Sequence, residues 1–150
     1  MNLITLSELS SPEMASIAAS AHSHPMTESN IKSCFGDLYR CIGINERDEL
    51  CGFAILHQIF EEATLMDICI NPVHQGKGYG KALLDAVQQQ ARESGAEILL
   101  LEVRESAIAA RSLYVNAGFE QSGRRKGYYK TADGSEDAIL MSLSIISNKK

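Results

Sequence analysis

The stretch "NPVHQGKGYGKALL", from Asn71 to Leu84, places Gly76, Gly78 and Gly80 within five positions, directly before a helical pattern. Glycine weakens a helix, so three glycines at a helix start need a reason. One reason is a loop whose backbone N–H groups bind an anion, because the helix dipole favours negative charge at that end. The other is a tight strand-to-helix turn without a ligand. The three glycines by themselves do not decide between the two.

Two well-known glycine loops do not fit this stretch. A dinucleotide-binding fingerprint needs GxGxxG, but Lys81 follows Gly78-Tyr79-Gly80. A P-loop needs GxxxxGK followed by Ser or Thr, but Ala82 follows Gly80-Lys81, and no glycine lies five residues before Gly80. An anion bound at this stretch would therefore be held by a glycine loop of another type.

Upstream of the loop, the hydrophobic pattern predicts a strand, two helices and three strands. Ser11 is the expected N-cap of the first helix, with Pro12 at its first position, and Thr27 is the expected cap of the second. Polar "NERDE" between two apolar runs predicts a hairpin, and the three strands should form an antiparallel meander. The expected elements are residues 2–9 (strand), 10–23 and 24–35 (helices), and 38–44, 50–59 and 63–71 (strands).

Downstream, residues 80–94 carry an apolar stripe at helical spacing, and Gly95 ends the helix. The continuous run Ile98 to Leu101 predicts a strand, residues 97–105, that is buried on both faces. A helix over 106–119, two strands (119–129 and 137–145) around an Asp133-Gly134 turn, and a frayed tail at 147–150 complete the chain. The order β-α-α-β-β-β-α-β-α-β-β predicts a mixed α/β (α+β) fold. Its sheet is mostly antiparallel, is flanked by helices and contains one right-handed βαβ crossover.

Composition limits the class of protein. A chain of 150 residues with 45% hydrophobic and 22% charged residues is expected to form a single domain, residues 1–150. The net charge of -5 argues against direct nucleic-acid binding. No apolar run approaches the roughly 18 residues of a membrane span, and the start lacks the pattern of a signal peptide. We therefore expect a cytoplasmic protein. Nothing in the sequence determines the oligomeric state, and a monomer is compatible with it.

The cysteines and histidines suggest neither disulfides nor a metal site. The four cysteines show no CxxC spacing, which favours reduced thiols. The histidines lie far apart except for His22 and His24, and no carboxylate or cysteine spacing completes a metal site. No histidine partner is indicated for Cys69, which argues against an acyl-cysteine intermediate.

Beyond these patterns, Gln75-x-x-Gly78-x-Gly80 between a strand and a helix resembles the acetyl-CoA motif Q/R-x-x-G-x-G/A of the GCN5-related N-acetyltransferases (GNAT). Residues 62–84, 99–119 and 128–143 are similar to the RimI-like branch, the bacterial ribosomal-protein-alanine N-acetyltransferases. The L-E-V-R, L-Y-x-x-x-G-F and Y-Y…E-D-A…M elements are the discriminating parts. The resemblance spans residues 50 to 144, with a weaker trace at 21–29.

This resemblance implies the GNAT fold and acetyl-CoA as co-substrate, with no metal. It implies loop amides that hold the coenzyme A pyrophosphate, and a preceding strand whose backbone pairs with the pantetheine arm. Ala107 stands where the family usually carries an asparagine that touches the coenzyme. The implied cofactor-binding residues are Ile68, Cys69, Ile70, Gln75, Gly76, Lys77, Gly78, Tyr79, Gly80, Lys81 and Ala107.

Glu102 and Tyr114 are the catalytic candidates. The resemblance implies that Glu102 takes the proton of the acceptor amine and that Tyr114 protonates the leaving thiolate. Without it, Glu102 could equally be a strand-end glutamate paired with Arg104, and Tyr114 could be core filling. An α-amino group has a pKa of about 7.7–8.0, so an amine acceptor needs a base at neutral pH.

The resemblance implies an acceptor as well, the N-terminal segment of a small-subunit ribosomal protein (number eighteen), which begins with alanine. The last hairpin could form a wall of its groove, with an acidic rim that attracts the protonated terminus. The expected substrate-binding residues are Tyr128, Tyr129, Glu136 and Asp137. Two alternatives remain: an acetyltransferase for another protein terminus or a small-molecule amine, and a non-catalytic acyl-CoA-binding module.

Overall fold

The computed structural model describes residues 1–146, and the tail expected at 147–150 lies outside the described residues. The elements follow the predicted order, with three additional short 3₁₀ turns (η1 Glu8–Ser10, η2 Ser33–Phe35 and η3 Pro72–His74). The helices and strands are β1 Asn2–Thr5, α1 Ser11–Ala21, α2 Glu28–Lys32, β2 Tyr39–Glu46, β3 Glu49–Ile59, β4 Glu62–Ile70, α3 Tyr79–Glu93, β5 Ile98–Arg104, α4 Ile108–Asn116, β6 Glu120–Thr131 and β7 Gly134–Ser144.

The strands within residues 1–146 all belong to one seven-stranded sheet in the order β1-β2-β3-β4-β5-β7-β6. Neighbouring strands run antiparallel except for β4 and β5, which pair in parallel and are joined through α3. The predicted mixed, mostly antiparallel sheet with one βαβ crossover is therefore confirmed.

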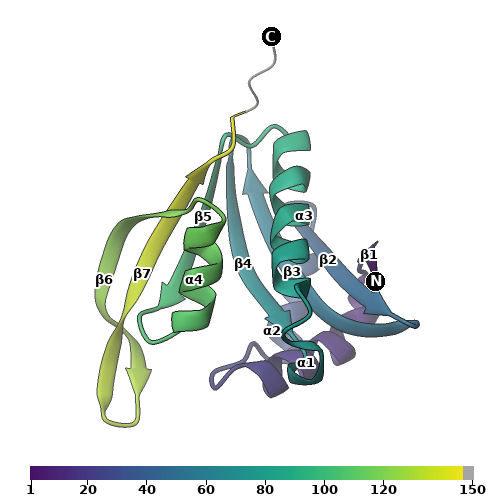
Figure 1. Cartoon of the computed structure of the whole chain (residues 1–150), viewed down its shortest axis with the longest axis horizontal. Coiled ribbons are helices and arrows are strands. Elements are labelled where there is room, and N and C mark those ends of the chain that lie inside the picture. Colours follow the sequence, from purple (N-terminus) through teal and green to yellow (C-terminus); the bar gives the residue numbers. More distant parts are fainter. Residues whose placement is uncertain (147–150) are drawn as a thin grey trace.

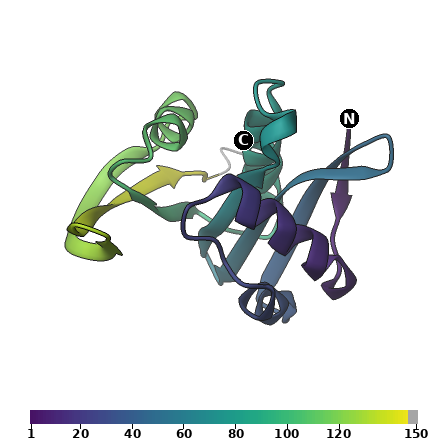
Figure 2. The same ribbon diagram turned by 90° about the horizontal axis from the view of Figure 1, so that it is seen from below.

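Helices cover both faces of the sheet and define two cores. Leu83, Leu84 and Val87 of α3 and Tyr114 of α4 belong to one apolar cluster. Met14 and Ile17 of α1 and Ile31 of α2 belong to the other. Figures 1 and 2 show α3 and α4 on one side of the sheet and α1 on the other. None of the helices in residues 1–146 is long and apolar enough to cross a membrane.

The N-terminal segment departs from the sequence prediction. The first strand ends at Thr5 instead of residue 9, because a 3₁₀ turn over Glu8–Ser10 follows and runs directly into α1. Ser10, which has helical backbone angles, takes the N-cap position, so Ser11 is already helical and makes no capping bond. The predicted Thr27 cap is confirmed, since its side chain accepts a hydrogen bond from the Asn30 amide.

The prediction that β5 is buried on both faces is only half right. Leu99 and Leu101 are buried, whereas Ile98 and Leu100 are only partly buried. Residues that alternate along a strand face opposite sides of the sheet. The side of Leu99 and Leu101 belongs to the core beneath α3 and α4. On the other side, α1 packs on β3 and β4, so Ile98 and Leu100 receive less cover.

The sheet opens between its two central strands. β4 and β5 pair only over Glu62–Thr64 and Ile98–Leu100. Beyond these residues the strands separate, as Figure 1 shows. From Leu65 to Ile70, the edge of β4 that faces β5 is therefore free of a neighbouring strand. This opening positions the candidate site.

Candidate active site

A cavity of about 440 Å³ lies where β4 and β5 separate. Its walls come from β4, β5, α4 with the residues just before it, Tyr129 of β6, and the end of α1 with the segment that follows it. Of the predicted site residues, Ile68, Glu102, Ala107, Tyr114 and Tyr129 line it. The two catalytic candidates, from different elements, therefore reach one cavity.

Glu102 lies on β5 at the cavity wall, and 31% of its side chain is exposed. Its Oε1 atom lies 3.2 Å from Nε of Arg125 on β6. The pairing with Arg104 that the sequence left open does not form, because Arg104 contacts Glu136 at 3.0 Å. Glu102 is thus a carboxylate held at the rim of the cavity by a partner from the neighbouring hairpin.

Tyr114 points from α4 into the same cavity and is only 6% exposed. Its ring packs against Phe119, with 5.7 Å between the ring centroids. Burial, with the charge of Asp67 nearby, raises the pKa of the Tyr114 hydroxyl above its ordinary value. The hydroxyl therefore carries its proton at neutral pH and is available as a donor. Tyr114 is both a core residue and a cavity residue.

A β-bulge in β4 decides on which face of the sheet its later side chains lie. Ile55 and Leu56 of β3 pair with Asp67 and Leu65, which leaves Met66 without a partner. One extra residue reverses the alternation of faces along a strand. After the bulge, Ile68 packs on the core beneath α3, while Cys69 belongs to the core beneath α1 and α2.

The glycine loop adopts the backbone conformation that its composition suggests. Gly76 and Gly78 have φ angles of 81° and 83°, in the region that L side chains rarely adopt. Gly78 is the N-cap of α3 and supplies no side-chain capping bond, and the first four amides of a helix have no partner within it. Free amides at the end of an uncovered strand edge suit an extended, anionic ligand, which fits the coenzyme A expected here.

The polar side chains of the loop form hydrogen bonds and ion pairs with other residues of the protein. Gln75 donates from Nε2 to the Ile70 carbonyl at 3.1 Å, which ties the loop to the end of β4. Lys77 lies 3.3 Å from a Glu46 carboxylate oxygen. Tyr79 donates its hydroxyl hydrogen bond to Glu46, which raises the pKa of Tyr79 to about 12. Lys81 pairs with Asp85, so any role of this loop in anion binding falls to its backbone amides.

Ala107 takes the N-cap position of α4 and makes no side-chain capping bond. It also lines the cavity. An asparagine side chain at this position could cap the helix and reach into the cavity, whereas the alanine methyl group can do neither. The departure from the family pattern noted in the sequence therefore lies at the site itself.

The four hairpin residues expected to bind substrate are not brought together at the cavity. Tyr129 lines it, beneath the Arg104 guanidinium, which lies 4.1 Å from the ring centroid. Tyr128, Glu136 and Asp137 do not line it. Asp137 lies 2.6 Å from an Arg124 nitrogen. The Ser106 and Arg104 side chains hold the pKa of Glu136 below its ordinary value. Both acidic side chains are thus neutralised by arginines and do not form a free acidic rim.

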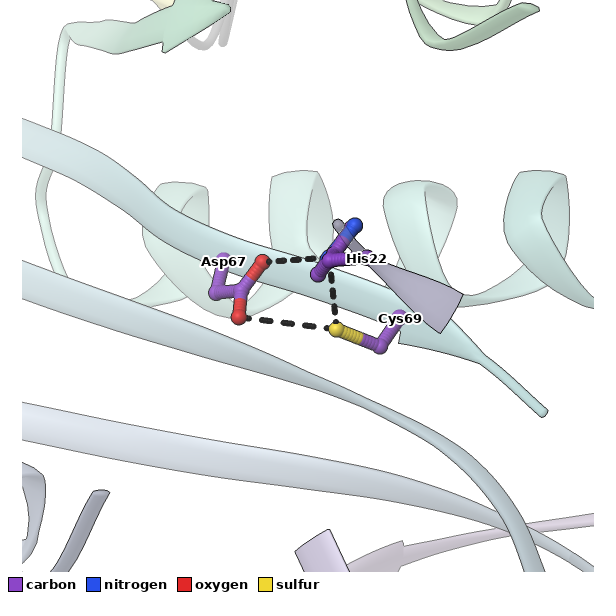
Figure 3. A group of neighbouring side chains, drawn as sticks. All are labelled: His22, Asp67 and Cys69. Atoms are coloured by element: carbon purple, nitrogen blue, oxygen red, sulfur yellow. Dashed lines mark hydrogen bonds and ion pairs between the residues drawn. The ribbon is translucent and has the colours of Figure 1, made fainter. Parts of the chain in front are cut away.

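The structure adds cavity residues that the sequence did not single out, among them His22, Asp67 and Arg104. The sequence feature that could have identified His22 is the weak family resemblance over residues 21–29. The expectation that Cys69 lacks a histidine partner is wrong, because Nε2 of His22 lies 2.9 Å from its Sγ (Figure 3). Burial nevertheless raises the pKa of the Cys69 thiol far above its ordinary value, so the thiol is a poor nucleophile.

Comparisons with known proteins agree with this geometry. The sequence profile of the acetyltransferase (GNAT) family matches residues 5–119. The chain therefore belongs to this family of acyltransferases, as its glycine loop indicated.

Individual relatives show which members of the family this chain is similar to. The chain is 37% identical over 146 residues to the ribosomal protein bS18-alanine N-acetyltransferase of Escherichia coli (strain K12), covering 97% of this chain and 99% of that protein. It is 40% identical over 126 residues to the enzyme of the same name from Haemophilus influenzae, covering 83% and 86%. The crystal structure of the Escherichia coli ribosomal-protein-alanine N-acetyltransferase superposes with a TM-score of 0.93 at 34% identity, covering 99% of this chain and 96% of that one. The resemblance to the RimI-like branch is confirmed.

Proposed function

We propose that this chain, as a single N-acetyltransferase domain, transfers the acetyl group of acetyl-CoA to the N-terminal alanine of ribosomal protein bS18. The observation that carries the proposal is the convergence of Glu102 and Tyr114 on one cavity between β4 and β5. The names of relatives at 37% and 40% identity support this acceptor. A ribosomal protein as acceptor implies a cytoplasmic site of action.

The coenzyme would extend from the loop to the cavity along β4. The amides of Gly76 to Lys81 would bind the pyrophosphate, because no side chain caps the first turn of α3. The pantetheine arm would pair with the open backbone edge of Ile68 to Ile70, which leads from the loop to the cavity. At Ile68 the amide already donates to Asp67 Oδ1 at 2.9 Å, so its carbonyl is the group left for the arm.

Glu102 and Tyr114 would then act on opposite ends of the transfer. Glu102 takes one proton from the ammonium form of the α-amino group through one water and releases it to solvent. The neutral nitrogen then forms its bond to the acetyl carbonyl carbon, and its next proton leaves through the same water to Glu102. As the carbon–sulfur bond breaks, the Tyr114 hydroxyl donates its proton to the sulfur and regains one from solvent. Both reactants are bound together, so the reaction proceeds in a ternary complex and uses no metal.

The acceptor would enter from the side of the last hairpin. Tyr129 is its most direct wall residue, since it lines the cavity and is fixed by Arg104. Tyr128, Glu136 and Asp137, which lie outside the cavity lining, would contact the peptide further from the amine. This arrangement suits an acceptor that is a short peptide and that enters the open cavity in extended form.

One experiment tests both the proposed acceptor and the proposed catalytic residues. Purified protein is incubated with acetyl-CoA and a hexapeptide that carries the bS18 N-terminus, and acetylation is followed by mass spectrometry. Glu102→Gln and Tyr114→Phe should each lower kcat about 10²- to 10⁴-fold and leave acetyl-CoA binding intact. The matched controls are Glu13→Gln, exposed in α1, and Tyr39→Phe in β2, neither of which lines the cavity.

Each outcome has a defined meaning. Failure to acetylate the hexapeptide, with activity on another amine, would remove the acceptor and keep the enzyme. Wild-type turnover in both cavity variants would remove the mechanism. Binding of acetyl-CoA without transfer to any amine would support an acyl-CoA-binding module instead.

A further inference from the structure

Three metal-ligating side chains meet at the wall of the cavity (Figure 3). Nε2 of His22 lies 2.9 Å from Sγ of Cys69 and 3.2 Å from Oδ1 of Asp67. The Cys69 sulfur lies 3.4 Å from Oδ2 of Asp67. We propose that His22, Asp67 and Cys69 form a binding site for Zn²⁺ or a similar divalent transition-metal ion, with a fourth position open to the cavity.

The donor geometry is close to that of a tetrahedral site. Zinc lies about 2.3 Å from a cysteine sulfur, 2.0–2.1 Å from a histidine nitrogen and 2.0–2.2 Å from a carboxylate oxygen, which separates such donors by about 3.4–3.6 Å. The histidine nitrogen now lies 2.9 Å from the sulfur and 3.2 Å from Asp67 Oδ1, whereas the sulfur lies 3.4 Å from the other carboxylate oxygen, Oδ2. An ion would need to spread the nitrogen and the sulfur by about 0.7 Å, and the carboxylate would turn to offer it one oxygen. Side-chain rotation alone can supply such a shift.

The fold fixes all three donors from the main chain. Asp67 and Cys69 follow the β4 bulge and are two residues apart, so both face the side of α1. His22 directly follows α1, and its amide donates to the Ala18 carbonyl at 2.9 Å. The Ile68 amide holds the Asp67 carboxylate at 2.9 Å. Ligands that are held in place in this way lose little freedom when an ion binds.

The charges of the group also call for a cation. Asp67 and a thiolate at Cys69 would place two negative charges 3.4 Å apart, where they repel each other. Zinc deprotonates a thiol that it binds and neutralises the neighbouring carboxylate. The same repulsion disfavours Cys69 as a nucleophile, so an ion is the ligand that this group of donors suits.

An ion can reach the site from solvent. The His22 and Asp67 side chains are 38% and 14% exposed, and both line the cavity. Cys69 is the innermost donor, with 2% exposure. Because Glu102 lines the same cavity, a bound ion would stand in the path of the acceptor amine. This inhibitory effect rests on the proposed function, whereas the binding of the ion does not.

A second donor group is a weaker candidate. Glu46, Cys51 and His74 also lie within metal-binding range of one another. Lys77, however, places its ammonium group 3.3 Å from both a Glu46 oxygen and Nδ1 of His74. This cation already occupies the position that a metal ion would take. Cys51 therefore provides a matched control for Cys69.

The test uses untagged, metal-free protein kept reduced with a phosphine, titrated with Co²⁺ and then with Zn²⁺. The wild type should bind one equivalent of Co²⁺ and show the near-ultraviolet absorption of a thiolate–Co²⁺ bond, which Zn²⁺ then removes. Cys69→Ala should abolish this absorption, and Cys51→Ala should retain it. His22→Gln should weaken Co²⁺ binding at least about tenfold, as expected for the loss of a metal ligand.

The proposal is overturned if saturating Co²⁺ gives no thiolate band, or if the band survives in Cys69→Ala or disappears in Cys51→Ala. Circular dichroism checks that each variant is folded. Should Cys69→Ala not fold, His22→Gln decides the question, because its partly exposed side chain lies outside the core. Unchanged Co²⁺ affinity in that variant overturns the site.

Discussion

Gly78 and Gly80 are expected to respond in opposite ways to the same substitution. Gly78 has a φ of 83°, and an added Cβ would meet no heavy atom within 4 Å. The cost of Gly78→Ala is therefore conformational: about 1–2 kcal/mol for an L residue in the left-handed region, offset by about 0.4–1 kcal/mol from the stiffer unfolded chain. A net loss of about 1 kcal/mol lowers Tm by about 2–4 °C in a protein of this size.

Gly80 is the second residue of α3 and is not among the glycines with positive φ. A Cβ there would lie 3.5 Å from a Leu113 methyl carbon, an ordinary contact. Gly80→Ala should therefore raise the unfolding free energy, by up to about 1 kcal/mol, because alanine favours a helix. Acetyl-CoA binding should be nearly unchanged, because the family motif allows alanine as well as glycine at this position.

Thermal unfolding and acetyl-CoA titration calorimetry of both variants separate these effects. The expected pattern is a lower Tm for Gly78→Ala, and a higher Tm with nearly unchanged coenzyme binding for Gly80→Ala. A Tm that falls further in Gly80→Ala than in Gly78→Ala would refute the conformational reasoning. A tenfold or greater loss of coenzyme affinity in Gly80→Ala would refute the expectation that this position accepts a methyl group beside the pyrophosphate.

Three further substitutions test other parts of the structure. Ala107→Asn should cap α4 and raise the unfolding free energy in urea by about 0.5–2 kcal/mol, and a lower KM for acetyl-CoA would indicate that the family contact is restored; a less stable variant would contradict the cap. Lys77→Ala should change the Kd for acetyl-CoA less than about threefold, because Lys77 is paired with Glu46, and a tenfold loss in calorimetry would assign it a direct phosphate contact. Glu136 has a lowered pKa, so its ionised side chain stabilises the fold above pH 4.5, its ordinary pKa, and this contribution is lost as pH falls through the folded-state pKa. In urea unfolding between about pH 5 and 3, Glu136→Gln should therefore make the fall in stability with pH less steep. An unchanged slope would count against the pairing of Glu136 with Arg104.

Much of the fold follows from local sequence. The helical stripe after Gly80, the apolar strand runs and the turn residues specify the element order, since each depends on neighbours a few residues away. The glycine loop was placed correctly before α3, and the structure adds that Gly76 and Gly78 have positive φ angles. The start of α1 was misplaced by one residue because a 3₁₀ turn enters the helix, which composition does not reveal.

The candidate site was predicted only in part, because its pairings cross the sheet. Glu102 and Tyr114 were identifiable from family elements, but the choice of Arg125 over Arg104 as partner depends on how β6 lies beside β7 and β5. The arginine partners of Glu136 and Asp137 come from β5 and β6, and the sequence did not predict them either. Ion pairs between elements depend on strand order and register, and single-sequence patterns do not encode either.

The sequence by itself determined a GNAT acetyltransferase with a glycine loop that opens a helix, because those features reside in contiguous residues. Only the tertiary structure decided what surrounds the cavity between β4 and β5. The bulge at Met66 turns Asp67 and Cys69 towards α1, where His22 stands 45 and 47 residues away in sequence. One extra residue in a strand reverses its faces, and that reversal is visible only when the partner strand is in place.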